Sequence, residues 1–200
     1  MSTIRAATLA QITRTSAEWV FVDLGFASKA KTCGLLVGDG EPRALSFSQL
    51  QAELASICNV SPAPLNLLLE APLSVAFGVN GNPTGRSVEK RSGQSRYWYV
   101  GLGCSVLVAA TYLLRSIHDL SPRREIRLFE GLVSFKPKGI PSSHTDGVIQ
   151  LRNLAWSGNA SLGRFVGPED LISNQGDRIV SAFHVASMDF VVPPVVVIGG

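Results

Sequence analysis

The sequence predicts an α/β protein built on a mixed sheet of five strands, the first three antiparallel, with helices on both faces. Two segments rich in β-branched and aromatic residues, 19–23 and 32–37, are joined by a turn, as in a hairpin. A continuous apolar run at 65–69 is typical of a strand buried on both faces. Helical segments alternate with the later strands, which is the order expected when helices cover a sheet.

Length and composition limit the class of protein. We assign residues 1–18 to an N-terminal tail or short helix and residues 19–200 to a single domain, which is long enough for a sizeable core. Apolar residues make up 46% of the chain and charged residues 16%, which excludes disordered, collagen-like and charge-rich coiled-coil proteins. The net charge of +3 does not by itself indicate a nucleic-acid-binding protein.

No segment resembles a membrane span or a secretory signal. The longest apolar segment, residues 102–114, is shorter than the roughly 20 residues that a bilayer requires. The three cysteines show no metal-binding or disulfide spacing, so we expect a cytoplasmic protein without membrane association. The oligomeric state stays open, and the apolar segment 195–198 is a candidate for pairing with a second chain in a homodimer.

The first half of the chain supplies the hairpin, a third strand, a helix and the buried strand. Residues 44–47 are expected to form the third strand after the hairpin. Apolar residues at helical spacing predict a helix over 48–57, with Ser48 as its N-cap. The apolar strand 65–69 then ends at Glu70 and is followed by Pro72.

The second half begins with a stretch rich in Gly, Pro, Ser and Asn over 71–96, which predicts a long loop. A loop of that length inside a compact domain is usually functional or mobile. Residues 97–117 are apolar nearly all round, which predicts a buried helix. The remaining segments are predicted as a strand at 124–129, a helix at 148–156, a loop at 158–176, a last helix at 177–190 and a short strand at 195–198.

Four carboxylates stand at the ends of these elements. Asp23, Glu70 and Glu130 end predicted strands, and Asp177 begins the predicted last helix. Because buried carboxylates are costly without a partner, such groups are solvated, hydrogen-bonded or bound to a metal. Each also has a structural explanation. Asp23 could be a turn residue and Glu70 the partner of an arginine. Glu130 could be a solvated strand end, and Asp177 a helix N-cap.

A shared site is expected if the strands are neighbours, because Asp23 and Glu70 would then meet at one edge of the sheet. Clustered carboxylates repel one another unless a cation neutralises them. Oxygen ligands suit Mg²⁺ or Mn²⁺, and a substrate phosphate would complete the coordination. Such a site would activate water for phosphodiester cleavage.

The order of these motifs resembles the ribonuclease-H-like superfamily over about residues 19–190. The segments that carry the resemblance are Phe21-Val-Asp23-Leu-Gly25, Leu67-Leu-Leu-Glu70-Ala-Pro72 and Asp177-Arg-Ile-Val-Ser-Ala-Phe183. They look most like a group of predicted nucleases with that fold, in which an arginine-bearing loop follows the fourth-strand acid. The resemblance implies a metal-dependent nuclease or a related phosphodiester hydrolase.

The same resemblance implies the roles of the acids. Asp23, Glu70 and Asp177 would be metal ligands and catalytic residues, with Glu130 as a fourth acid. The chain departs from the pattern at the last helix, where one acid replaces a pair of acids. Asp146 also begins a predicted helix and competes with Asp177 for that role.

A basic loop follows Glu70 and predicts a nucleic-acid partner. Residues 81–99 contain Arg86, Lys90, Arg91 and Arg96 against Glu89, a net charge of +3, and end in three aromatic residues. Arginines contact phosphates and aromatic rings stack on exposed bases. The alternative is a solvated loop, and for the three aromatic residues a place in the core of the next helix is an equal explanation. Lys29, in the first hairpin turn, is a further candidate phosphate contact.

Two other functions stay open. The acids would be inert in a catalytically silent module of the same fold that binds a protein or a nucleic acid. Asp23-Leu-Gly25 followed by Lys29 also looks like the first phosphate loop of actin-like and sugar-kinase proteins, although those bind ATP between two copies of the fold. His144 and His184 are candidate proton carriers, with a surface histidine as the commoner explanation.

Overall fold

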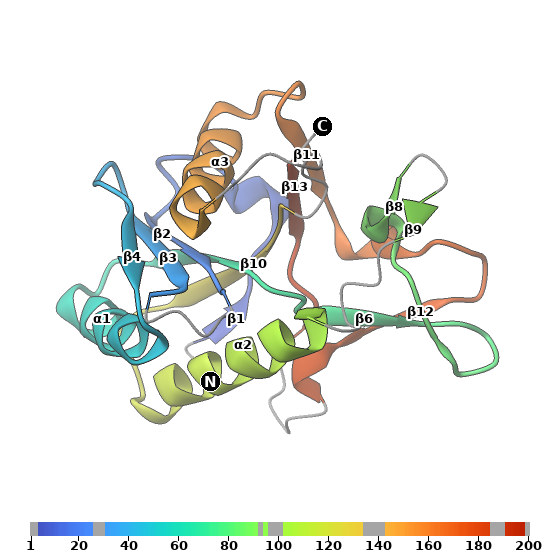
Figure 1. The fold of residues 1–200 in the computed structure, drawn as a ribbon, viewed down its shortest axis with the longest axis horizontal. Helices are drawn as coiled ribbons and strands as arrows, with labels where there is room; N and C mark the ends of the chain where they lie inside the picture. Colours follow the sequence, from blue (N-terminus) through green and yellow to red (C-terminus); the bar gives the residue numbers. More distant parts are fainter. Residues whose placement is uncertain are drawn as a thin grey trace.

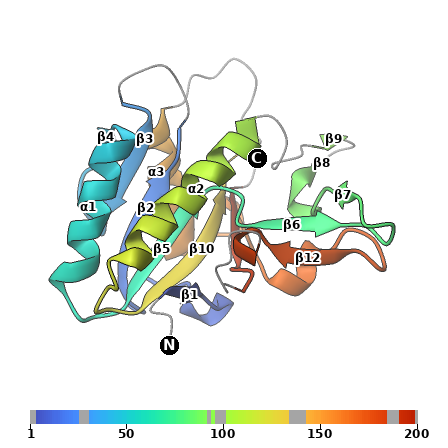
Figure 2. The same cartoon turned by 90° about the horizontal axis from the view of Figure 1, so that it is seen from below.

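The computed structural model describes residues 4–25, 31–91, 94–95, 102–133, 143–184 and 191–198. Eight strands form the main sheet of this α/β protein (Figures 1 and 2). They are β1 (Ile4–Ala6), β2 (Glu18–Asp23), β3 (Cys33–Val37), β4 (Arg43–Leu45), β5 (Leu65–Glu70), β10 (Ile126–Leu132), β11 (Gly163–Val166) and β13 (Val195–Ile198).

The strand order is β11-β13-β10-β5-β2-β3-β4, with β1 beside the first half of β10. As predicted, β2, β3 and β4 pair antiparallel. In contrast, β5 lies parallel to β2, and β10 lies parallel to β5. The sheet is mixed, as expected, but it has eight strands instead of five because β1, β11 and β13 extend it beyond β10.

Three helices cover the two faces of the main sheet (Figure 2). Helices α1 (Phe47–Val60) and α2 (Leu102–Asp119) lie on one face, and α3 (His144–Ser157) lies on the other. Helix α1 begins at the residue after Ser46, whose hydroxyl accepts a hydrogen bond from the Gln49 amide at 3.2 Å, so the N-cap is Ser46 and not Ser48. Ser143 caps α3 in the same way, through the Asp146 amide at 3.1 Å.

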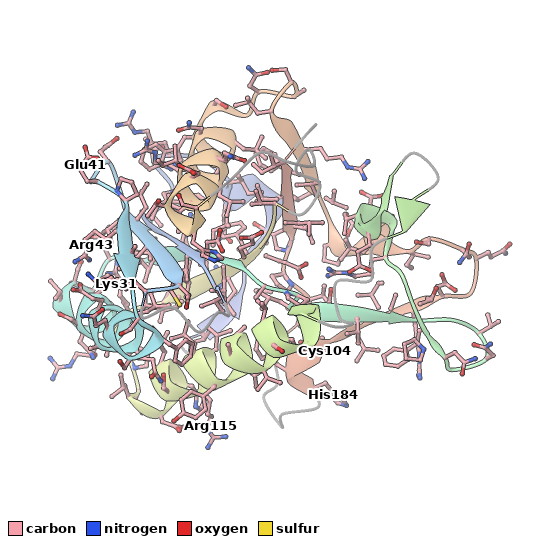
Figure 3. All side chains as sticks on the ribbon, in the orientation of Figure 1. Lys31, Glu41, Arg43, Cys104, Arg115 and His184 are labelled. Atoms are coloured by element: carbon pink, nitrogen blue, oxygen red, sulfur yellow. The ribbon has the colours of Figure 1, made fainter. Side chains whose placement is uncertain are left out.

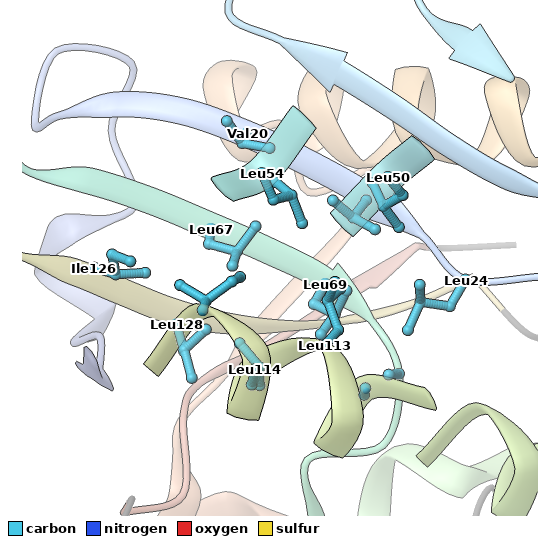
Figure 4. Packing of buried hydrophobic residues seen from close by; sticks show 14 of the residues in the cluster. Val20, Leu24, Leu50, Leu54, Leu67, Leu69, Leu113, Leu114, Ile126 and Leu128 are labelled. Carbon is cyan, nitrogen blue, oxygen red and sulfur yellow. The ribbon is translucent and has the colours of Figure 1, made fainter. Parts of the chain in front are cut away.

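Alternating side chains of the central strands form two apolar layers. Val20, Leu67 and Leu128 pack with Leu54 and Leu113 on the face of α1 and α2 (Figure 4). On the other face, Trp19, Phe21, Leu68 and Phe129 pack against α3. Each fully buried aliphatic side chain contributes roughly 1.5–3 kcal/mol, so these layers hold the strand ends in place.

A second, smaller sheet projects from one end of the main sheet (Figures 1 and 2). It consists of β6 (Ser74–Phe77), β7 (Pro83–Thr84) and β12 (Arg178–Ser181), and a two-stranded hairpin of β8 (Lys90–Arg91) and β9 (Gln94–Ser95) follows it. We call these five strands the arm. Short 3₁₀ helices lie at Leu9–Gln11, Ser87–Glu89, Pro168–Leu171 and Ala182–His184.

Several sequence predictions are wrong in ways that pairing explains. The expected last helix is strand β12 and a 3₁₀ turn over 178–184, because its residues pair antiparallel with β6; residues 185–190 lie outside the described chain. The expected loops 71–96 and 158–176 contain strands of the arm and β11.

The chain ends also belong to the sheet. Ile4–Ala6, in the expected tail or short helix, is strand β1, and the side chain of Ile4 lies in the core. The terminal strand β13 was predicted at its observed position, but it lies between β10 and β11 of its own chain. It therefore offers no open strand edge to a second copy.

Over the described residues, the helices are too short or too polar to cross a membrane.

The cysteines provide a test of this fold. Cys33 and Cys58 are buried, and Cys104 is exposed near the beginning of α2 (Figure 3). Burial raises the pKa of the Cys58 thiol to about 11, so almost no reactive thiolate forms at neutral pH.

We expect iodoacetamide to label Cys104 in the native protein and all three cysteines in urea, as measured by mass spectrometry. Native labelling of Cys58 as fast as Cys104 would contradict the fold.

Candidate functional site

Asp23 and Glu70 lie side by side at the carboxyl ends of two central strands. They are register partners in the parallel pair β2–β5, and both side chains point to the face covered by α3. Neighbouring strands lie about 4.8 Å apart, so the two carboxylates are within reach of one another. Asp23 is 1% exposed and Glu70 is 8% exposed, which places this pair of negative charges largely out of water.

Helix α3 supplies a partner for Asp23. The His144 Nδ1 atom lies 2.6 Å from Asp23 Oδ1, and the imidazole remains partly exposed. His144 is the first residue of α3, so the Asp23 carboxylate also lies beside the N-terminal end of a helix. Asp23 is therefore oriented by a ring from the helix that covers the face to which its side chain points.

Two glycines allow α3 to approach so closely. A Cβ atom on Gly147 would overlap Asp23 Oδ2, and a Cβ atom on Gly34 would overlap the His144 carbonyl oxygen. Gly34 is the register partner of Asp23 in the β2–β3 pair. The absence of side chains at these positions therefore sets the distance between the helix terminus and the acid.

Glu130 does not join Asp23 and Glu70. It lies inside β10, not after it, and alternates with Phe129, so its side chain points to the opposite face of the sheet. There it is fully buried and forms an ion pair with Arg86, with Nη2 and Oε1 2.7 Å apart. The strand continues through Leu132, and this continuation decides the face on which Glu130 lies.

Arg86, expected at the substrate, is fully buried in the same ion pair. Its guanidinium also contacts Glu89, with Nη2 and Oε1 3.0 Å apart. Burial raises the pKa of the Glu89 carboxyl, although the charge of Arg86 and its hydrogen bonds act in the opposite direction. Arg86 therefore has a structural partner on each side and presents no surface to a substrate in this structure.

The acid predicted for the last helix lies elsewhere. Asp177 precedes β12, where its carboxylate accepts hydrogen bonds from the Asn174 amide at 3.0 Å and side chain at 2.9 Å. Strand β12 approaches the main sheet at Ser181, which pairs with Ser74, so Asp177 is separated from that end by about 13 Å of extended chain. The structure does not bring it to Asp23 and Glu70.

Asp146, the competing acid, belongs to the helix that contacts Asp23. It lies in the first turn of α3, one residue before Gly147. Its carboxylate accepts a hydrogen bond from the Ser143 amide at 2.9 Å, which completes the cap of the helix. Asp146 thus belongs to the helix beside the candidate site, whereas Asp177 precedes the arm strand β12.

The other basic residues are only partly described. Lys90 and Arg91 form strand β8 of the arm, and their side chains lie outside the described part of the molecule. Lys29 and Arg96 lie wholly outside the described residues. Their expected contacts with phosphate remain predictions.

The histidines differ in their surroundings. His144 contacts Asp23, whereas His184 ends a short 3₁₀ helix after the arm strand β12 (Figure 3). The sequence signal for His144 was present in Ser143-His144-Thr145-Asp146-Gly147, where a serine cap and an acid three residues later mark a helix start. The contact of His144 with Asp23 depends on how α3 packs against the sheet, and no sequence pattern predicts that packing.

The chemistry available to this edge follows from its donors. Two carboxylates on neighbouring strands are hard oxygen ligands of the kind that Mg²⁺ and Mn²⁺ bind. Among the residues that the structure describes, no group of three or more His, Cys, Asp and Glu side chains is arranged to hold a metal ion. For such an ion, Asp23 and Glu70 would supply only part of a coordination shell, and water or a phosphate oxygen would have to supply the rest.

Comparisons with protein-family models, curated proteins and solved structures gave no match to this chain.

Replacement of Gly147 by alanine tests the close contact of α3 with Asp23. Alanine is favoured over glycine within a helix by about 1 kcal/mol. Overlap with Asp23 is expected to outweigh this gain and to lower the free energy of unfolding by about 1–2 kcal/mol. Urea denaturation measures the change, with Asn153→Ala on the exposed side of α3 as the control. Equal stabilisation by both alanines would contradict the packing of α3.

Proposed function

We propose that this chain is a metal-dependent nuclease or related phosphodiester hydrolase with a ribonuclease-H-like core. The single observation that carries the proposal is the placement of Asp23 and Glu70 as partners at the carboxyl ends of adjacent central strands. Ligand sites of sheets with parallel strands lie at these ends, where the chain leaves the sheet.

The strand order supports the ribonuclease-H-like part of the proposal. Read from β4, the order is β4-β3-β2-β5-β10, in which the first three strands along the chain are antiparallel. The fourth and fifth strands, β5 and β10, lie parallel to the first, β2. Helix α1 connects the third and fourth of these strands, and α2 lies between the fourth and fifth in sequence.

Asp23 and Glu70 would hold Mg²⁺ or Mn²⁺, and the N-terminal turn of α3 would stand beside them. A cation there would activate a water molecule and stabilise the charge that develops on a phosphodiester. Among the chain's own residues, His144 orients Asp23 through Nδ1, and Asp146 replaces Asp177 as the candidate helix acid. Glu130 and Arg86 take structural roles on the opposite face.

A nucleic acid is the substrate class that the charge distribution favours. Arg86 and Glu89 neutralise one another within the ion-pair cluster, so the basic loop's excess of +3 resides in Lys90, Arg91 and Arg96. Hairpin β8–β9 places Lys90 and Arg91 on the arm that begins four residues after Glu70. A phosphate backbone bound there would be attracted by charge without regard to base sequence.

A catalytically silent binding module is the second candidate. It is favoured by the near-complete burial of Asp23 and by the engagement of its Oδ1 atom with His144. In this module the acid would serve to attach α3 to the sheet, and nucleic-acid binding would need no divalent cation.

Substitution of the two acids separates these functions. We expect the wild-type protein to cleave single- or double-stranded DNA or RNA with Mn²⁺ or Mg²⁺, and EDTA to abolish cleavage. Asp23→Asn and Glu70→Gln each remove a ligand charge and should lower the cleavage rate by at least about 100-fold.

Asp177→Asn is the matched control, since it removes the acid that lies on the arm. It should leave the cleavage rate within about 3-fold of the wild type, while circular dichroism checks that all variants fold. Binding of nucleic acid without cleavage, unchanged by Glu70→Gln and by EDTA, would refute the nuclease and support the silent module.

A further inference from the structure

We propose that Glu130 and Arg86 are positioning residues that hold the Glu70 carboxylate at the sheet edge from the opposite face. Together with Glu89 they form a buried cluster, which we call the junction cluster, where the arm meets the main sheet. The inference rests on the proposed role of Glu70 as a metal ligand.

The junction cluster is densely connected. Arg86 Nη1 donates to Glu130 Oε2 at 2.9 Å and to Ser74 Oγ at 2.8 Å. Arg86 Nε donates to Glu89 Oε1 at 3.1 Å, and the Arg86 amide donates to Glu89 Oε2 at 2.9 Å. One guanidinium thus joins the end of β10, the beginning of β6 and the 3₁₀ helix of the arm.

The contacts of the two strand-end acids cross over between β5 and β10. Glu130 Oε2 accepts a hydrogen bond from the Leu73 amide at 2.8 Å, three residues after Glu70. Glu70 Oε1 accepts one from the Val133 amide at 3.2 Å, three residues after Glu130. Each acid therefore binds the backbone that follows the other strand, and loss of the Glu130 contact releases the segment that leads away from Glu70.

The arm reinforces this constraint on the segment after Glu70. The Ala182 amide donates to the Leu73 carbonyl at 3.0 Å, and Ser74 pairs with Ser181. Leu73 is thus bound through its amide by Glu130 and through its carbonyl by the arm. The chain between β5 and β6 cannot shift without breaking contacts on both sides.

The energetics of buried ion pairs favour a geometric role over a stabilising one. Removal of charges from water costs free energy that the ion pair often fails to recover, and apolar replacements of similar size are often as stable. In the junction cluster one guanidinium faces two buried carboxylates, which makes full compensation harder. What the cluster does specify is the direction of the chain after Glu70, because Glu130 binds the Leu73 amide and Arg86 binds both Glu130 and the Ser74 hydroxyl.

Glu130→Met tests the inference, since it removes the acceptor of the Leu73 amide but leaves Arg86 paired with Glu89. Glu130→Gln is the conservative variant, because its side-chain oxygen still accepts that hydrogen bond. The control is Arg43→Met with Glu53→Met, which removes the exposed ion pair between β4 and α1. If Glu130→Met fails to fold, the triple variant Arg86→Met, Glu89→Gln and Glu130→Met replaces it.

Amide hydrogen exchange provides a readout that does not depend on metal binding. In Glu130→Met the Val133 amide should exchange at least about 10-fold faster than in the wild type, whereas the Leu67 amide in β5 should change far less. Glu130→Gln and the control should leave both amides within about 3-fold. Equal acceleration of Val133 and Leu67, or no change at Val133, would overturn the positioning role.

Titration with Mn²⁺ provides the second readout. The dissociation constant should rise at least about 10-fold in Glu130→Met and return to within about 3-fold of the wild type in Glu130→Gln. A wild-type protein that binds no Mn²⁺ refutes the proposed function, and the Val133 amide then decides the positioning role alone. Unchanged Mn²⁺ affinity in Glu130→Met, with the wild type binding, refutes the positioning role.

Discussion

The removal of three carboxylates from water, at the ends of three adjacent parallel strands, is the constraint that organises this molecule. Asp23, Glu70 and Glu130 end or nearly end β2, β5 and β10, and none is more than 8% exposed. A buried carboxylate without donors costs several kcal/mol, so each must be met by a donor or a cation. His144, the Val133 amide, and Arg86 with the Leu73 amide supply the donors in this structure.

These donors come from the elements that surround the sheet edge. His144 brings the N-terminus of α3 against β2 and β3, and Arg86 brings the arm against β10. The positions of α3 and of the arm are thus fixed partly by their contacts with the acids. The two attachments lie on opposite faces of the sheet, and the backbone at 70–74 joins Glu70 to the residues that contact the arm.

The sequence allowed the antiparallel first strands and the buried strand to be predicted, because local patterns carry them. The meeting of Asp23 and Glu70 was expected only if their strands are neighbours, and the parallel pairing of β2 with β5 meets that condition. It did not allow the face of Glu130 to be predicted. That face depends on β10 running to Leu132, three residues beyond the predicted end at residue 129. The apolar residues of segment 177–190 recur at helical spacing, and only the pairing of β12 with β6 makes 178–181 a strand. The burial of Arg86 likewise depends on distant partners.

The division of the acids between two faces also explains why acids at strand ends are an ambiguous sign of a metal site. Asp23 and Glu70 share a face and an edge, which is what a cation requires of its ligands. Glu130 has the same sequence context, a strand end after apolar residues, but the pleat directs it to a guanidinium on the opposite face. The Glu130 carboxylate already has a cationic partner in Arg86, whereas Asp23 and Glu70 lie on the face away from that guanidinium. In the proposed function, Asp23 and Glu70 would bind the cation, and Glu130 would fix the chain segment that follows Glu70.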